Sequence, residues 1–334
     1  MMLTIVTYHY VRDLPRTRFP EIRGLATGRF EGQLDYLTKH YTFCHPDEVL
    51  AAVRGETVLP PNGCLLTFDD GLCDHYTTVF PRLEERGIPA VFFPAARPIR
   101  ERTMLEVHMI HFVLASVPDP RRLVAETLNL VDQHRATHAL PDRATLFRVC
   151  GAANRFDTLE VSFLKRLLQR ELPALVRRDI CRVLFQRHVT ADLTSFAAEL
   201  YMDLAQLRCL ARNGMAIGGH GDVHDWLELL GPSEQREEIR QTLSLLESVA
   251  GQRPANWIMG YPYGSYSKLT LDLLREAGCA VGLTSETGLV SDLARPLELC
   301  RLDTNDLPFA ADAPVSEWTN RARGTVEVGA GQAG

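Results

Sequence analysis

The chain has 334 residues, of which 46% are hydrophobic and 23% charged, and its formal net charge is -6. This composition is ordinary for a globular protein and excludes wholesale disorder. Lys and Arg form no extended cluster, so we expect no nucleic acid as the main partner. No apolar stretch approaches the length of a membrane span, and the first nine residues lack the features of a signal peptide. The eight cysteines are scattered without a C-x-x-C pair, which is typical of a reducing compartment. We therefore expect a cytoplasmic protein.

Residues 1–99 alternate the patterns of strands and helices, as in a sheet of mostly parallel strands. Apolar runs predict strands at 3–8, 64–68 and 90–93. The last of these is a continuous apolar stretch, which a parallel sheet buries on both faces. Helices are expected at 27–38 with Thr27 as N-cap, from Pro46 to near Gly55, and at 74–86 with Asp74 as N-cap.

Residues 100–202 are rich in Leu, Arg, Ala and Glu at helical spacing and have almost no strand-like runs. We interpret them as a helical insertion or lid subdomain. Its helices are expected at 104–116, 120–134, 157–171, 173–188 and 193–200.

Residues 203–318 return to alternation and are predicted to complete the sheet. The expected elements are helix 204–212, strand 215–218, helix 233–250 with Ser233 as N-cap, strand 256–260, helix 268–277, and strands 279–284 and 297–302. Residues 319–334 end in a Gly- and Ala-rich sequence and are expected to form a flexible tail.

This alternation predicts an α/β fold, with a largely parallel sheet wrapped by helices, either open or closed as a barrel. In such folds the chemistry gathers at the carboxyl ends of the strands. Three polar segments fall at predicted strand ends, namely Asp69-Asp70, His220 to His224, and Tyr261-Pro262-Tyr263-Gly264. We expect them to share one site.

The adjacent carboxylates Asp69 and Asp70 follow an apolar run in the sequence Thr-Phe-Asp-Asp-Gly. Like charges in a poorly solvated place raise one another's pKa, so such a pair is expected where a cation compensates it or where one member acts as a base. A helix N-cap is the alternative for either residue. His220 and His224 add two imidazoles. One carboxylate and two histidines form a metal-ligand set that leaves coordination positions open for water and substrate.

Thr-Phe-Asp-Asp-Gly, then His-x-x-x-His, then a Pro-Tyr-Gly turn, in this order, resembles the polysaccharide deacetylase (NodB-like, carbohydrate esterase 4) family over roughly residues 3–98 and 203–305. The resemblance implies a distorted or incomplete, mostly parallel (β/α) barrel. It also implies that Asp70, His220 and His224 bind a divalent metal, that Asp69 is the catalytic base, and that the backbone N–H at Tyr263 steadies the oxyanion.

The chain departs from the family pattern at two places. The family often has an Arg at the start of the third motif, whereas this chain has Met259 and Gly260 there. We predict that Arg301 replaces it, the alternative being a surface ion pair with Asp303 or Glu298.

The family's late His in a Leu-x-His setting is also missing, because no His follows His224. His9 is our first candidate for the general acid. His108 and His111, at the mouth of the insertion, are further candidates that could instead bind substrate, as could Tyr261. Asp222 could orient His224 as a hydrogen-bond acceptor, or be exposed to solvent.

We therefore expect a metal-dependent hydrolase that removes an N-acyl group, acetyl or formyl, from an amino sugar. With no secretion signal, the expected substrate is an intracellular amino-sugar or sugar-conjugate precursor. Zn²⁺ suits the ligands best, and Co²⁺, Ni²⁺ and Fe²⁺ are admissible. The alternatives are an O-deacetylase, a non-sugar amidase, or an inactive glycan-binding homologue. The sequence leaves the oligomeric state open.

Overall fold

The computed structural model describes residues 2–152 and 157–324, and contacts between residues divide the chain into two compact units. The first unit contains residues up to 13, residues 24–101 and residues from 199 onwards, and the second contains residues 14–23 and 102–198. The domain boundaries given by the sequence remain a prediction. In one respect the contacts differ from it, because residues 14–23 group with the helical residues 102–198 rather than with the sheet.

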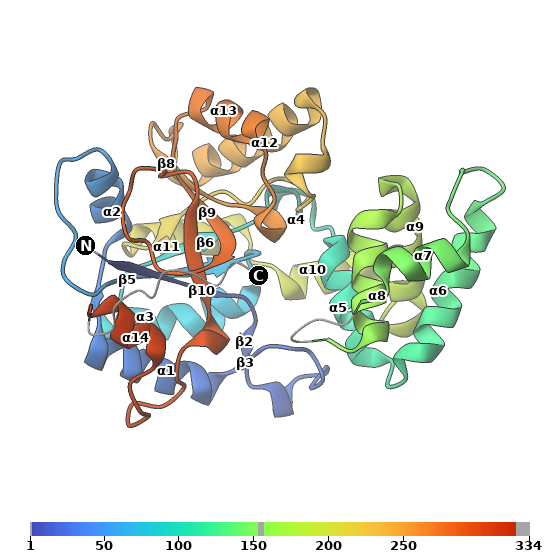
Figure 1. Cartoon of the computed structure of the whole chain (residues 1–334), viewed down its shortest axis with the longest axis horizontal. Coiled ribbons are helices and arrows are strands. Elements are labelled where there is room, and N and C mark those ends of the chain that lie inside the picture. The colour runs from blue at the N-terminus through green and yellow to red at the C-terminus, as the bar shows by residue number, and fades with distance from the viewer. Residues whose placement is uncertain (1, 153–156, 325–334) are drawn as a thin grey trace. The chain divides into compact units, whose positions relative to one another are not determined.

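An eight-stranded sheet forms the centre of the first unit (Figure 1). The strand order is β7-β6-β5-β1-β10-β9-β8, with β4 paired to β5 beside this path, and all of these pairs are parallel. The strands are β1 Leu3–Tyr8, β4 Thr42–Phe43, β5 Gly63–Asp69, β6 Ala90–Phe93, β7 Ala216–Ile217, β8 Trp257–Gly260, β9 Cys279–Thr287 and β10 Leu299–Asp303. A separate pair consists of β2 Val11–Arg12 and β3 Leu25–Ala26.

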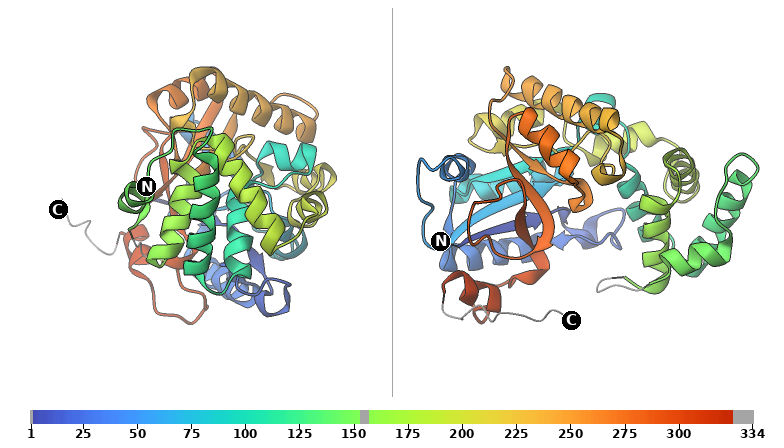
Figure 2. Two further views of the ribbon diagram at one scale, coloured as in Figure 1. Left: turned by 90° about the vertical axis from the view of Figure 1, so that its right-hand side faces the viewer. Right: turned by 45° about the horizontal axis from the view of Figure 1, so that its top comes forward.

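The sheet curls until its two edges meet. Just beyond β7, the Gly218 N–H donates to the Phe92 carbonyl of β6 at 2.8 Å. The Gly219 N–H donates to the Ile258 carbonyl of β8 at 2.9 Å, and the Gly260 N–H donates back to the Gly219 carbonyl at 2.9 Å. This curled parallel sheet with helices around it confirms the predicted distorted (β/α) barrel (Figure 2).

Side chains of alternate strand residues pack on opposite faces, as the two-residue period of a strand requires. Leu66 and Phe68 of β5 point toward α1 and α3, in a cluster that also contains Phe30. Leu65 of β5 and Phe93 of β6 instead pack inside the barrel. Every residue of β5 is buried, which explains why its sequence is an unbroken apolar run up to Thr67.

The helices of the first unit flank the sheet, and most of them lie between its strands along the chain. They are α1 Thr27–His40, α2 Pro46–Val53, α3 Phe80–Arg86, α4 Ala96–Glu101, α11 Leu204–Arg212, α12 Pro232–Ala250, α13 Lys268–Glu276 and α14 Glu317–Ala322. Short helical turns occur at η2 His75–Val79, η4 Leu227–Leu229, η5 Pro262–Gly264 and η6 Thr304–Asp306.

Three predicted caps are wrong. Thr27 and Ser233 are already inside their helices, whose N-caps are Ala26 and Gly231. Asp74 precedes η2 but makes no side-chain cap hydrogen bond, because its carboxylate accepts from Arg12 Nε at 2.7 Å.

The segment predicted as a flexible tail begins with ordered structure. Residues 319–322 belong to α14, and Thr319 is fully buried. Its hydroxyl is satisfied there by hydrogen bonds with the hydroxyls of Tyr36 and Tyr41, each at 2.8 Å. The tail prediction is therefore wrong for this part, and residues 325–334 lie outside the described residues.

The second unit is built from helices, as predicted, and its long helices run alongside one another in Figure 2. They are η1 Leu14–Arg16, α5 Glu106–Ser116, α6 Pro120–His134, α7 Arg143–Cys150, α8 Leu159–Arg166, η3 Leu167–Glu171, α9 Ala174–His188 and α10 Leu193–Leu200, which crosses the boundary between the units. Helix α7 was not predicted. Within the described residues, no helix combines the length and apolarity that crossing a membrane requires.

We predict that Gly218→Ala destabilises the barrel where its edges meet. The added Cβ would lie 2.3 Å from a ring carbon of Phe93 and 2.7 Å from the Ile258 carbonyl oxygen. Overpacking of this kind costs about 1–3 kcal/mol in the free energy of unfolding, which urea denaturation measures. Gly28→Ala in α1 is the control, because nothing lies within 4 Å of its Cβ position and stability should be unchanged or higher. Equal stability of the two variants would contradict the prediction.

Candidate metal centre

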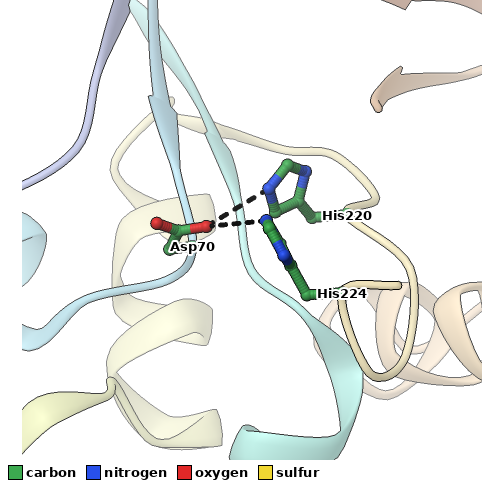
Figure 3. A group of neighbouring side chains, drawn as sticks. All are labelled: Asp70, His220 and His224. Atoms are coloured by element: carbon green, nitrogen blue, oxygen red, sulfur yellow. Dashed lines mark ion pairs between the residues drawn. The ribbon is translucent and has the colours of Figure 1, made fainter. Parts of the chain in front are cut away.

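Asp70, His220 and His224 converge beyond the carboxyl ends of β5 and β7 (Figure 3). His220 Nε2 lies 3.3 Å and His224 Nε2 lies 3.4 Å from Asp70 Oδ1. All three residues are buried, and one potential ligand atom from each lies within 4.8 Å of the other two. Two imidazole nitrogens and one carboxylate oxygen in this arrangement could hold a divalent metal ion.

Unusual backbone conformations aim two of these side chains. Asp70 has φ 79° and His224 has φ 60°, a region that residues other than glycine rarely occupy. Gly71 follows with φ 68°, and a Cβ there would lie 2.7 Å from Pro94. The Asp-Asp-Gly sequence therefore meets a local steric requirement as well as a chemical one.

The hydrogen bond to His220 sets the tautomer that suits a metal. His220 Nδ1 lies 2.7 Å from the Gly260 carbonyl oxygen, which can only accept, so Nδ1 carries the proton. Nε2 is then the nitrogen presented to Asp70. Burial lowers the pKa of His220, but the hydrogen bond and charge of Asp70 and the charge of Asp69 outweigh it and raise the pKa. Metal and proton therefore compete for this nitrogen.

Asp69 points to a different set of partners. Arg301 Nη1 donates to its carboxylate at 2.9 Å, and Thr7 Oγ1 donates at 3.3 Å. Burial would raise the pKa of Asp69, yet the charges of Arg301, His220 and His9 together lower it to about 2. Asp69 is therefore ionised at neutral pH and held in one orientation.

The predicted pairing of Arg301 with Asp69 is present in the structure, and the alternative of a surface ion pair with Asp303 or Glu298 is not. Arg301 is only 5% exposed, and its Nε donates to the Thr284 carbonyl of β9 at 2.8 Å. The neighbouring strand thus fixes one side of the guanidinium while the other side faces Asp69.

His9 lies at the end of β1 beside this pair. Its Nε2 is 3.9 Å from Asp69 Oδ2, and its side chain is 47% exposed. The buried His75 holds the main chain here, because its Nε2 donates to the His9 carbonyl at 2.9 Å. His9 is thus both near Asp69 and open to solvent.

Tyr263 closes the other side of the site. It has φ 56°, its ring stacks on Trp226 with centroids 4.6 Å apart, and its centroid lies 4.6 Å from that of His224. Gly264 follows with φ 68°, where a Cβ would lie 2.0 Å from Ser285 Oγ. Only glycine fits this turn.

The structure places two of the predicted substrate-binding residues, Tyr261 and His108, in buried positions, and their role in binding stays a prediction. Tyr261 is 1% exposed, because its hydroxyl donates to the Leu297 carbonyl at 2.8 Å and its ring stacks on Tyr266. His108 is fully buried inside the second unit. His111 does line a cavity of about 630 Å³ within that unit, together with Arg23 and Lys165. Its role in catalysis or binding stays a prediction.

Asp222 neither orients His224 nor faces solvent. Its side chain is 2% exposed and accepts from Arg97 Nη2 at 2.7 Å and from Arg100 Nη2 at 2.9 Å. These arginines and Trp226 were not predicted as site residues. Trp226 lies two residues after His224, a position that could have suggested it, whereas nothing in the sequence pattern marks Arg97 or Arg100.

The family model described as Polysaccharide deacetylase matches residues 171–282. This segment contains His220, His224 and the turn at 261–264, but neither Asp69 nor Asp70. Among curated proteins, YxkH of Bacillus subtilis (strain 168), which carries the name of a polysaccharide deacetylase, is 30% identical over 86 residues. That match covers 26% of this chain and 30% of YxkH, so less than a third of the relative is aligned.

Solved structures resemble the chain over most of its length. The deacetylase PplD of Streptococcus pyogenes in complex with acetate matches with a TM-score of 0.55 and 16% identity, covering 92% of this chain and 95% of that one. A de-N-acetylase of Aggregatibacter actinomycetemcomitans matches with a TM-score of 0.54 and 14% identity, covering 91% of this chain and 96% of that one. IcaB of Ammonifex degensii matches with a TM-score of 0.51 and 19% identity, covering 90% of this chain and 91% of that one. At these identities the likeness establishes the fold.

We predict that Arg301→Met changes how stability depends on pH in the metal-free protein. The pKa of Asp69 is about 2 in the folded protein against an ordinary 3.8, so Asp69 stabilises the fold above about pH 4, and this contribution is lost as the pH falls through about 2. Without Arg301, the largest of the charges that offset burial is lost and the pKa of Asp69 rises. The loss in free energy of unfolding should then be largest at pH 7 and shrink below pH 4.

Urea denaturation between pH 3 and pH 8 measures this difference. Arg54→Met is the control, because it removes an exposed ion pair with Glu56 and should have little effect at any pH. A loss in the Arg301 variant that does not depend on pH would contradict the role assigned to this pair.

Proposed function

We propose that this chain is a metal-dependent hydrolase of the polysaccharide deacetylase (NodB-like) superfamily, and that it removes an acetyl or formyl group from the nitrogen of an amino sugar. The observation that carries the proposal is the convergence of Asp70, His220 and His224, with the ionised Asp69 held beside them by Arg301. A metal-ligand set and a separate carboxylate base are what hydrolysis of an unactivated amide needs.

Asp70, His220 and His224 would hold the metal ion, and Zn²⁺ fits these donors best. Such a cation lowers the pKa of water and polarises an acyl carbonyl. Asp69 would accept the proton of the attacking water. The low pKa of Asp69 makes it a weak base but keeps it ionised. Because a bound cation would lower the pKa of the attacking water, the difference in pKa between that water and Asp69 would be smaller.

Two further groups complete the proposed chemistry. The backbone N–H of Tyr263 would stabilise the negative charge that develops on the carbonyl oxygen, since Pro262 restricts the backbone of this turn and the ring of Tyr263 is packed on Trp226 and His224. His9 would give a proton to the departing nitrogen, because it is near Asp69 and open to solvent.

The proposed substrate is a small amino sugar or sugar conjugate made in the cytoplasm. The eight cysteines support that location, since all of them are free thiols and five are buried, as suits a reducing compartment. Removal of an O-acetyl group and hydrolysis of a non-sugar amide are the rivals that use the same residues. Catalytic inactivity is the third rival, and the pairing of Arg301 with Asp69 weighs against it by supplying the cation that the third motif lacks.

We predict that the purified protein releases acetate or formate, with an equal amount of free amine, from N-acylated hexosamines. Asp69→Asn should reduce turnover by about 10²- to 10⁴-fold without loss of bound metal, because Asp69 is not a ligand. Asp70→Ala and His224→Ala should lose both metal and activity. Chelation should abolish wild-type turnover, and Zn²⁺ or Co²⁺ should restore it.

The panel for this assay contains N-acetyl and N-formyl hexosamines, free and nucleotide-linked, beside O-acetylated sugars and simple N-acetyl amides. Metal content is measured by elemental analysis. Asp272→Asn, an exposed change on α13, is the matched control. Preference for O-acetyl sugars or simple amides would favour the rival enzymes. Full activity of Asp69→Asn would refute the assigned base.

We also predict that His9→Gln slows hydrolysis of an N-acetyl hexosamine far more than hydrolysis of 4-nitrophenyl acetate. An amine must be protonated as it leaves, whereas 4-nitrophenolate leaves without a proton, so only the amide needs the general acid. His111→Gln, measured in parallel, tests the partly buried candidate in the second unit. Equal losses on both substrates would show that His9 is not the proton donor.

A further inference from the structure

The turn between the two histidine ligands has a demanding geometry. Gly221 has φ 72° and His224 has φ 60°. A non-glycine residue in this region costs of order 1–3 kcal/mol and persists only where its surroundings hold it in place. The structure supplies that support from two helices, α4 and α12.

Helix α12 supports the turn through one buried carboxylate. Glu238 Oε2 accepts from the Asp222 N–H at 2.6 Å and from the Val223 N–H at 3.2 Å. Glu238 is 6% exposed, and a Cβ on Gly221 would lie 2.9 Å from its Oε2. The carboxylate therefore occupies the concave side of the turn and satisfies two of its backbone donors.

Helix α4 supports the same turn from its outer side. The Ala96 N–H donates to the Gly221 carbonyl at 2.9 Å, and the Arg97 N–H donates to the Asp222 carbonyl at 3.0 Å. The side chains of Arg97 and Arg100 bind the Asp222 carboxylate. Two cations thus offset the cost of burying this acid.

We propose that Glu238 is a positioning residue and that, with Asp222, Arg97 and Arg100, it holds residues 221–223 in the conformation that aims His220 and His224 at Asp70 before any metal binds. The inference deepens the proposed function and rests on it, because it assigns a role toward the same metal site. The Glu238 carboxylate binds the backbone N–H groups of the turn and is not one of the proposed metal ligands.

Substitutions of Glu238 can show whether it supports the turn through hydrogen bonding or through its charge. Burial raises its pKa to about 7, although the two backbone N–H groups act to lower it. A carbonyl oxygen is enough to accept both N–H groups, so glutamine should serve nearly as well as glutamate, whereas alanine leaves both donors without their acceptor.

The test compares Glu238→Ala, Glu238→Gln, Arg97→Met and a control. The control is Arg236→Met, which lies on the same helix as Glu238 and removes an exposed ion pair with Glu276 of α13. Zn²⁺ affinity is measured by competition with a chelator, and the coordination geometry by the visible spectrum of the Co²⁺ form. Amide hydrogen exchange of residues 221–223 is followed in the metal-free protein. Thermal unfolding identifies any variant that fails to fold.

We expect Glu238→Ala to weaken Zn²⁺ binding by about 10- to 100-fold, the range known for partners that orient metal ligands. It should also alter the Co²⁺ spectrum and speed the exchange of the Asp222 and Val223 amides. Glu238→Gln should stay within about threefold of the wild type, and Arg97→Met should lose about tenfold, as one of two cations on Asp222. Arg236→Met should match the wild type.

Wild-type affinity and slow exchange in Glu238→Ala would overturn the inference, as would a glutamine variant as weak as the alanine one. If Glu238→Ala fails to fold, Arg97→Met and Glu238→Gln decide the matter. A wild-type protein that binds neither Zn²⁺ nor Co²⁺ would refute the proposed function instead. Hydrogen exchange is measured in the metal-free protein, so it would still test whether Glu238 supports the turn.

Discussion

The site depends on how two adjacent buried carboxylates at the end of β5 are compensated. Two like charges side by side in a dehydrated place are unstable unless each finds its own partner. Asp69 finds Arg301 from β10, and Asp70 finds the imidazoles of His220 and His224. This division also separates the chemistry, because one acid is left as an oriented anion while the other joins a set of metal-binding donors.

Closure of the barrel makes that compensation possible. The partners of the Asp pair lie more than a hundred residues away along the chain, yet parallel strands bring their carboxyl ends to one edge. The meeting of β6, Gly218-Gly219 and β8 completes this edge. Glycines are required there because Phe93 and Trp257 pack directly against them. The backbone that closes the barrel runs straight into His220.

The site also concentrates backbone strain. Among the described residues, five other than glycine have positive φ, and three of them are Asp70, His224 and Tyr263. Such residues persist only where their surroundings hold them, and they gather where function needs one fixed direction. At the His220–His224 turn that support comes from α4 and α12. The polar groups of these helices are thus as much a part of the site as the donors themselves.

Much of this could be predicted from local pattern. Apolar runs and helical spacing predicted a largely parallel sheet wrapped by helices, and the resemblance of the motifs implied the distorted barrel. Helices α6 and α10 begin and end where the pattern predicts, and Pro120 is the first residue of α6. The motifs at strand ends predicted the convergence of Asp70 with the two histidines, since strand polarity alone brings them to one edge.

Burial, by contrast, depends on how the strands curve and which helix lies behind them. The burial of Tyr261 and His108 and the pairing of Asp222 with Arg97 and Arg100 were therefore not foreseen, and Glu238 was not recognised. The amino-acid sequence by itself determined which chemical groups are available and at which end of the sheet they lie, because periodicity is a local property. Only the tertiary structure decided which of them face one another, because that depends on contacts between segments that are far apart in the chain.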